Sequence, residues 1–158
     1  MTTLSVTGSR TVTSSHQVTV MADALIEDAD LSDAYLLLLP GGMPGSKNLN
    51  GHEGVRQALL AHAAEGKPIG AICAAPMVLG SLGLLTGRRA TCSPGFEVYL
   101  DGATYTHELV TTDGPFITGE GPAASFPYAY TLLSLFLPAE DVRTLQGKMQ
   151  FLHLIGEE

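Results

Sequence analysis

In the stretch GKPIGAICAAPMVLG, residues 66–80, the spacing of the apolar residues changes at a single cysteine. Before Cys73, the residues Ile69, Ala71 and Ile72 form an apolar run of the length of a short buried strand. After Cys73, the apolar residues continue in the pattern of a helix that starts near Ala74. The stretch therefore predicts a strand that turns directly into a helix, with a thiol at the turn.

The rest of the chain repeats this alternation of strand and helix. Two runs rich in Thr and Val, residues 2–8 and 16–22, predict an antiparallel ribbon, and the continuous apolar run 34–42 predicts a strand covered on both faces. The further expected elements are a helix over 52–66, strands over 68–72 and 89–93, a hairpin over 108–121, and helices over 123–136 and 139–154. This order predicts a single α/β domain with a mostly parallel sheet.

Composition narrows the classes of partner. The 158 residues fit one domain, and the net charge of −8 disfavours nucleic acid and anionic membrane surfaces as partners. The longest purely apolar stretches are far shorter than the roughly 18 residues that a membrane span needs. We expect Cys73 and Cys92 to be reduced and unpaired, as in a cytoplasmic protein, and Cys92 to be structural. The histidines show no spacing typical of a metal site.

The turn at Cys73 is a candidate reactive site. A sharp strand-to-helix turn projects its side chain out of the sheet, and free amides at a helix start favour the thiolate form of a cysteine. Gly41 and Gly42 follow a predicted strand, as do residues 119–121, and the carboxyl ends of parallel strands share one edge of a sheet. A buried inert cysteine and a plain glycine turn are the alternative interpretations.

Three segments carry a family resemblance: LLPGGMPGSKNL, GKPIGAICAAPMVLGSLGLLTGRRATCSPGFE and ITGEGPAASFPYAYTLL. In this order and spacing they resemble the DJ-1/PfpI (ThiJ) superfamily, specifically its DJ-1/YajL-like branch, over nearly the whole chain. The resemblance implies a flavodoxin-like sandwich, similar to class I glutamine amidotransferases, a homodimer, and an easily oxidised elbow cysteine that needs no cofactor. It places Cys73 as the nucleophile, and Gly41, Gly42 and the amide of Ala74 around an oxyanion.

The sequence departs from this family in three ways. The family begins with a strand and a helix that supply a glutamate to the thiol, so residues 1–158 are expected to be one domain truncated at its N-terminus or started at the wrong codon. Such a domain should have low stability and a weaker thiolate. A histidine of the branch is replaced by Gly102, while His107 could reach back, although a surface strand histidine is the favoured interpretation. Glu120 stands where arginine is common, and either orients substrate or is a solvated loop residue.

The favoured hypothesis is a cofactor-free glyoxalase or deglycase in which the Cys73 thiolate adds to a small carbonyl such as a 2-oxoaldehyde. The second hypothesis is a non-enzymatic redox sensor or chaperone that acts through oxidation of Cys73. A cysteine peptidase or amidase is a weaker third alternative, because no histidine occupies a recognisable partner position.

Overall fold

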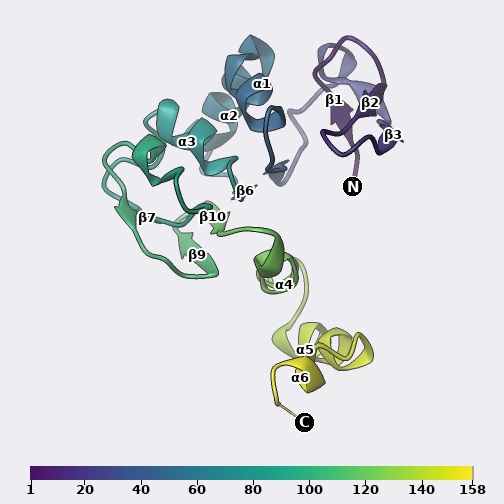
Figure 1. Ribbon diagram of the computed structural model, residues 1–158, viewed down its shortest axis with the longest axis vertical. Helices are drawn as coiled ribbons and strands as arrows, with labels where there is room; N and C mark the ends of the chain where they lie inside the picture. Colours follow the sequence, from purple (N-terminus) through teal and green to yellow (C-terminus); the bar gives the residue numbers. More distant parts are fainter. Residues whose placement is uncertain (158) are drawn as a thin grey trace.

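A four-stranded sheet forms the centre of the molecule in the computed structural model, which describes residues 1–157 (Figure 1). Its strand order is β5 (Leu37–Leu39), β6 (Ile69–Ile72), β10 (Phe116–Gly119) and β9 (Val110–Asp113). The first three strands are parallel, and β9 pairs antiparallel with β10 through the turn at Gly114. The mostly parallel sheet and the hairpin predicted from the sequence are therefore confirmed.

Helices cover both faces of this sheet. Val55 and Leu59 of α2 (Glu53–Ala64) and Val78 of α3 (Pro76–Ser81) share one apolar core with strand residues such as Phe116. Ile117 points the other way and packs with Tyr128 and Leu132 of α4 (Ser125–Leu133). Adjacent strand residues point to opposite faces, so this alternation gives the predicted sandwich.

The ends of α2 follow from its sequence. The His52 ring accepts a hydrogen bond from the Val55 amide at 3.3 Å and caps the first turn. Gly66 adopts a φ of +69° two residues after Ala64, which confirms the expected glycine terminator. The short helix α1 (Gly45–Gly51) precedes α2 and contacts α3.

The N-terminal ribbon differs from the prediction. The antiparallel pair is β2 (Thr11–Thr13) with β3 (Thr19–Met21), so the segment expected to separate two strands contributes one of them. The first run forms β1 (Leu4–Ser5), which pairs parallel with β4 (Ala24–Leu25) ahead of the one-turn helix Ile26–Asp28. Ser14 sets the ribbon's tight turn, because its amide and side chain both bond Val18.

Strand β5 is only partly covered, which corrects the prediction of a strand buried on both faces. Leu39 is buried, but Leu38 is 42% exposed and the preceding Tyr35 is 53% exposed. Within the described chain β5 pairs with β6 alone, so its outer edge carries no neighbouring strand. The apolar run correctly predicts a strand, but hydrophobicity alone does not show that one edge of this strand is unpaired.

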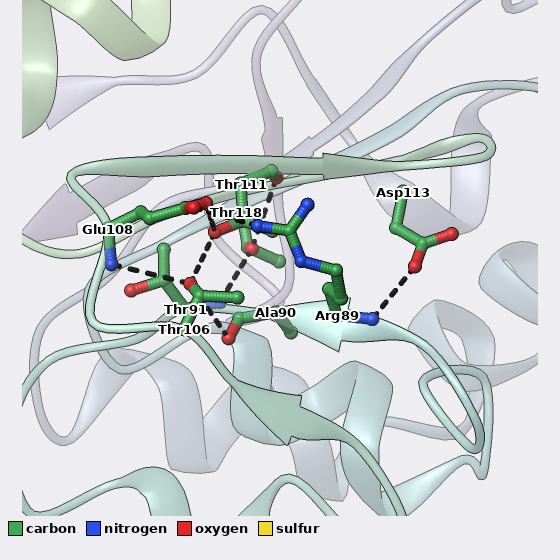
Figure 2. Close-up of polar contacts among 8 residues, drawn as sticks. All are labelled: Arg89, Ala90, Thr91, Thr106, Glu108, Thr111, Asp113 and Thr118. Carbon is green, nitrogen blue, oxygen red and sulfur yellow. Dashed lines mark hydrogen bonds and ion pairs between the residues drawn. The ribbon is translucent and has the colours of Figure 1, made fainter.

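Hydrogen bonds that involve several threonines connect the segment around residues 89–106 to the β9–β10 hairpin (Figure 2). Strand β7 (Arg89–Ala90) pairs with β8 (Thr104–Tyr105), and a short 3₁₀ turn, Glu97–Tyr99, lies between them. The Thr118 hydroxyl accepts the Thr91 amide at 2.9 Å, and Asp113 accepts the Arg89 amide at 2.8 Å. Both bonds hold β7 and the adjacent Thr91 against the β9–β10 hairpin.

The C-terminal helices lie at the far end of the molecule from the ribbon (Figure 1). Pro122–Ala124 forms a 3₁₀ turn before α4, and Pro127 lies in the first turn of α4, where its missing amide hydrogen is tolerated. The predicted terminal helix is divided into α5 (Ala139–Lys148) and α6 (Phe151–Leu154), since Gln150 takes a left-handed conformation. Among the described helices, none is both long and apolar enough to cross a membrane.

Candidate functional site

Cys73 occupies a strained turn directly after β6. Its φ is +65°, a region that costs a residue with a side chain about 1–3 kcal/mol unless the surroundings impose it. Two hydrogen bonds impose it here: the Cys73 amide donates to the Gly119 carbonyl, and the Cys73 carbonyl accepts the Ser93 amide, each at 2.9 Å. The thiol therefore lies on a fixed backbone elbow and is partly exposed to solvent.

The helix after this elbow starts later than predicted. The first residue of α3 is Pro76, not Ala74, and the helix has six residues. Residues 73–75 instead form a turn, closed by a 3.1 Å bond from the Ala75 amide to the Ile72 carbonyl. The helix was placed too early because Ala74 and Ala75 suit a helix as well as a turn.

Gly41 packs directly on the elbow cysteine. A Cβ added at Gly41 would lie 2.5 Å from the Cys73 Cβ, 2.6 Å from the Ile72 carbonyl oxygen and 3.3 Å from the Cys73 Sγ. Only glycine allows such an approach, so the ends of β5 and β6 meet at the thiol as the sequence predicts. Gly42 has a φ of +85°, a left-handed conformation that favours glycine.

Three backbone amides near this turn lack a protein acceptor. Across residues 1–157, no hydrogen bond is donated by the amides of Gly41, Gly42 or Ala74. Ala74 is almost completely buried. Gly42 is exposed, so water can bond its amide, whereas Gly41 is partly buried. Unpartnered amides at buried or partly buried positions such as Ala74 and Gly41 are uncommon, and they stabilise a negative oxygen placed close to them.

Cys92 is fully buried, as expected for a structural cysteine. Burial, with smaller contributions from the charges of Glu97, Cys73 and Glu120, raises the pKa of the Cys92 thiol to about 12. Neither cysteine forms a disulfide.

Tyr105 joins this group through its hydroxyl, which donates to the Cys92 carbonyl at 3.4 Å. Burial raises the pKa of Tyr105, with smaller contributions from Cys92, Glu120 and Glu97. Neither Tyr105 nor Glu97 is predicted from the sequence, because nothing in their local sequence links them to the cysteine turn.

His107 and Glu120 are the two accessory residues that the sequence suggests for the site. His107 lies in the exposed loop between β8 and β9, not on a strand as expected, with a φ of +57° and its ring 4.0 Å from that of Tyr105. Glu120 directly follows Gly119, whose carbonyl holds the Cys73 amide, and its own amide donates to Leu109 at 2.9 Å. Glu120 is half-buried, whereas Gly102 lies in a separate turn against Thr86.

The remaining histidines do not gather at the elbow. His52 pairs with Glu27 at 3.2 Å, and His62 is buried against the Pro68 carbonyl at 3.1 Å. In the part of the chain that the structure describes, no group of three or more His, Cys, Asp and Glu residues could hold a metal ion.

Comparison with known proteins gives consistent matches. The sequence model of the DJ-1/PfpI family matches residues 1–135. The Parkinson disease protein 7 homolog of Danio rerio is 34% identical over 137 residues, which cover 84% of this chain and 72% of that protein. Protein DJ-1 homolog B of Arabidopsis thaliana is 32% identical over 145 residues, covering 90% of this chain and 33% of that protein. The chain thus spans about a third of the length of this plant relative.

A relative with an enzyme name and two solved structures extend the comparison. Deglycase PYRAB04690 of Pyrococcus abyssi is 30% identical over 127 residues, covering 78% of this chain and 75% of that protein. A DJ-1 superfamily protein from Salmonella typhimurium superposes with a TM-score of 0.86 at 34% identity, covering 94% of this chain and 81% of that one. Oxidized DJ-1 of Toxoplasma gondii gives 0.88 at 29% identity, with the same coverage.

Proposed function

The chain belongs to the DJ-1/PfpI family, and from this premise we propose that Cys73 is a nucleophile that adds to small reactive carbonyl compounds such as 2-oxoaldehydes. The observation that carries the proposal is the fixed elbow: a partly exposed cysteine at a φ of +65°, packed against Gly41 and followed by Ala74, whose buried amide has no acceptor within residues 1–157. The name deglycase on the Pyrococcus abyssi relative supports the same class of chemistry.

The proposed reaction begins with attack of the Cys73 thiolate on the aldehyde carbon. A carbon–sulfur bond forms, the carbonyl π electrons move to oxygen, and the alkoxide is stabilised by the amides of Gly41, Gly42 and Ala74. Protonation of that oxygen gives a hemithioacetal. A proton then moves from the former aldehyde carbon to the neighbouring carbonyl carbon, and water releases a 2-hydroxy acid from the resulting thioester.

The proton transfers need a general base, and Glu120 is the best-placed carboxylate among the residues predicted from the sequence. It adjoins the carbonyl that holds the Cys73 amide, and its charge acts on both Cys92 and Tyr105. A positioned general base contributes about 10²- to 10⁴-fold in rate. We therefore expect Glu120→Gln to lower kcat/KM by at least tenfold, and His107→Asn to change it by less.

The test is to incubate the protein with methylglyoxal and follow lactate. Turnover should fall to the uncatalysed background in Cys73→Ala and persist in Cys92→Ala, with circular dichroism confirming that both variants fold. Equal turnover in the wild type and Cys73→Ala would refute the proposal.

Redox sensing is the second candidate function, and it is supported by the oxidized state that is named for the Toxoplasma gondii structure. Peroxide would then add one or two oxygen atoms to Cys73, giving sulfenic or sulfinic acid. No methylglyoxal turnover, together with a peroxide-dependent mass gain confined to Cys73, would replace the enzyme with the sensor. A homodimer and a cytoplasmic location remain proposals from the family resemblance, and sedimentation velocity tests the first.

A further inference from the structure

A pocket of about 430 Å³ lies at the end of the sheet opposite to Cys73. The Cys73 amide bonds the Gly119 carbonyl where the parallel strands β6 and β10 end. The Ile69 amide bonds the Pro115 carbonyl at 2.8 Å where the same two strands begin, and Pro115 lines the pocket. The length of a strand therefore separates the pocket from the thiol, so the two are distinct sites.

Most of the pocket wall is apolar. It is built by the C-terminal half of α2, the loop after α3 and the start of β10, and its apolar residues include Leu60, Ala64, Leu84, Pro115 and Phe116. Two polar side chains, those of Thr86 and Arg88, interrupt this wall. An apolar lining with a few polar groups is the usual composition of a small-molecule site.

Arg88 carries the only charge among the described residues that line the pocket, and three contacts hold its guanidinium. Its Nη1 donates to Asp113 Oδ1 at 3.3 Å. The guanidinium carbon lies 5.1 Å from the centre of the Phe116 ring, a cation–π contact. A Cβ added at Gly114 would lie 2.7 Å from Nη1, so the hairpin turn packs against the same nitrogen. A guanidinium held in this way loses little freedom when it binds a ligand.

Most of the hydrogen-bond donors on this wall remain unused. Within residues 1–157, Nε and Nη2 of Arg88 donate to no protein acceptor, although a guanidinium has five N–H donors. The Thr86 methyl is packed, because a Cβ added at Gly102 would lie 3.1 Å from it. The Thr86 hydroxyl instead lies 4.0 Å from the position of a Cβ at Gly83, another lining residue. The described pocket thus offers N–H and O–H donors, and no carboxylate lines it.

These donors favour an anion with a single charge. The planar fork of an arginine matches the two oxygens of a carboxylate. Asp113 already pairs with Arg88, and the whole chain has a net charge of −8, so a second negative charge on the ligand would be repelled. The apolar wall favours a hydrocarbon body attached to that carboxylate.

From these observations we propose that the pocket binds a small monocarboxylate with an apolar aryl or alkyl body. Its carboxylate accepts hydrogen bonds from the free N–H groups of Arg88 and from the Thr86 hydroxyl, and its hydrocarbon lies against Leu60 and Leu84. Binding forms no covalent bond. The proposal does not depend on the carbonyl chemistry at Cys73, so either can fail alone.

The probe is benzoate, titrated into the full chain up to tens of millimolar and followed by proton–nitrogen correlation NMR. We expect saturable shifts of the amides of Ala63, Leu84 and Phe116, which line the pocket, and none at Cys73. Benzyl alcohol has a similar size without the charge, and phenyl phosphate carries more negative charge. Both should bind at least tenfold more weakly than benzoate.

Two pairs of variants locate the site. Arg88→Gln removes the charge and should weaken benzoate binding at least tenfold while leaving that of benzyl alcohol unchanged. Its control is Arg89→Gln, because Arg89 pairs with Glu108 and does not line the pocket. Ala64→Glu adds a carboxylate at an exposed lining position and should abolish benzoate binding, whereas Ala61→Glu, exposed on the same helix but outside the lining, should not. Circular dichroism confirms folding, and Ala64→Glu tests the site even if Arg88→Gln does not fold.

Four results would overturn the proposal. An absence of benzoate-dependent shifts would show that the pocket binds no carboxylate, and shifts that spare the pocket residues would place the ligand elsewhere. Equal binding of benzoate and benzyl alcohol, with no effect of Arg88→Gln, would show an apolar hollow that does not recognise an anion. Tighter binding of phenyl phosphate than of benzoate would assign Arg88 to a phosphorylated ligand.

Discussion

Gly41→Ala tests whether the elbow is as tightly packed as the structure shows. The new Cβ would lie 2.5 Å from the Cys73 Cβ and 2.6 Å from the Ile72 carbonyl oxygen, whereas carbon atoms in contact prefer separations of about 3.5–4.0 Å. One of the two chain segments must therefore move by roughly 1 Å.

Neither segment can move freely. Cys73 is held by two 2.9 Å hydrogen bonds, to Gly119 and from Ser93, and Ile72 is the last residue of β6. Overpacking in a rigid surrounding costs about 1–3 kcal/mol, and the two backbone bonds place this case toward the upper end. For a chain of this size, 2–3 kcal/mol corresponds to a fall in Tm of about 5–10 °C.

The assay is urea unfolding together with the rate of iodoacetamide alkylation at Cys73. We expect Gly41→Ala to lose about 2–3 kcal/mol and to alkylate several-fold more slowly, because its methyl group would also lie 3.3 Å from the Cys73 Sγ. The matched control is Gly45→Ala at the start of α1, where an added Cβ meets nothing within 4 Å and stability should stay equal or rise slightly. If Gly41→Ala matched Gly45→Ala in both measurements, the packing at the elbow would be refuted.

Three further predictions concern buried groups. Thr118→Val should lower the free energy of unfolding by about 1–3 kcal/mol in chemical denaturation, because it leaves the buried Thr91 amide without its 2.9 Å acceptor (Figure 2). Thr112→Val, on the exposed side of β9, should change the free energy of unfolding little, and equal losses in the two variants would contradict the hydrogen bond. The pKa of the Cys92 thiol is about 12 in the folded chain and about 8.5 in the unfolded chain, so the stability that the protonated thiol contributes is complete below pH 8.5. This stability should be lost as the pH rises toward 12, by up to about 1.4 kcal/mol per pH unit. Cys92→Ala should make the free energy of unfolding depend less on pH in melts across pH 8–11. Tyr128→Phe removes a buried hydroxyl that has no partner among residues 1–157 and should raise the free energy of unfolding by about 1 kcal/mol; a loss of stability in calorimetry would show that the hydroxyl has a partner.

Much of the fold could be predicted because its signals are local. The run at residues 68–72, the terminator Gly66 and the turn at Gly114 each specify their own backbone, and all three are confirmed. The errors arose where neighbours in space decide the outcome. The pairing of β2 with β3, the exposure of Leu38 and the break at Gln150 depend on strand edges and turns that hydrophobic periodicity does not report.

The residues of the candidate site likewise fall into those that the sequence predicts and those that it does not. Glycines at strand ends and a cysteine at a strand-to-helix turn are visible in the sequence, and the structure brings Gly41 and Gly119 to Cys73. Tyr105 and Glu97 were missed, since their relation to Cys92 exists only after β7 and β8 fold over the sheet.

The sequence by itself determined that this chain is an α/β sandwich with a thiol at the turn after β6, because backbone conformation and hydrophobic period are written in adjacent residues. Only the tertiary structure decided which groups surround that thiol and which strand edge stays open. Both depend on contacts between segments far apart in the chain, and burial, charge and hydrogen bonding act through space rather than along the sequence.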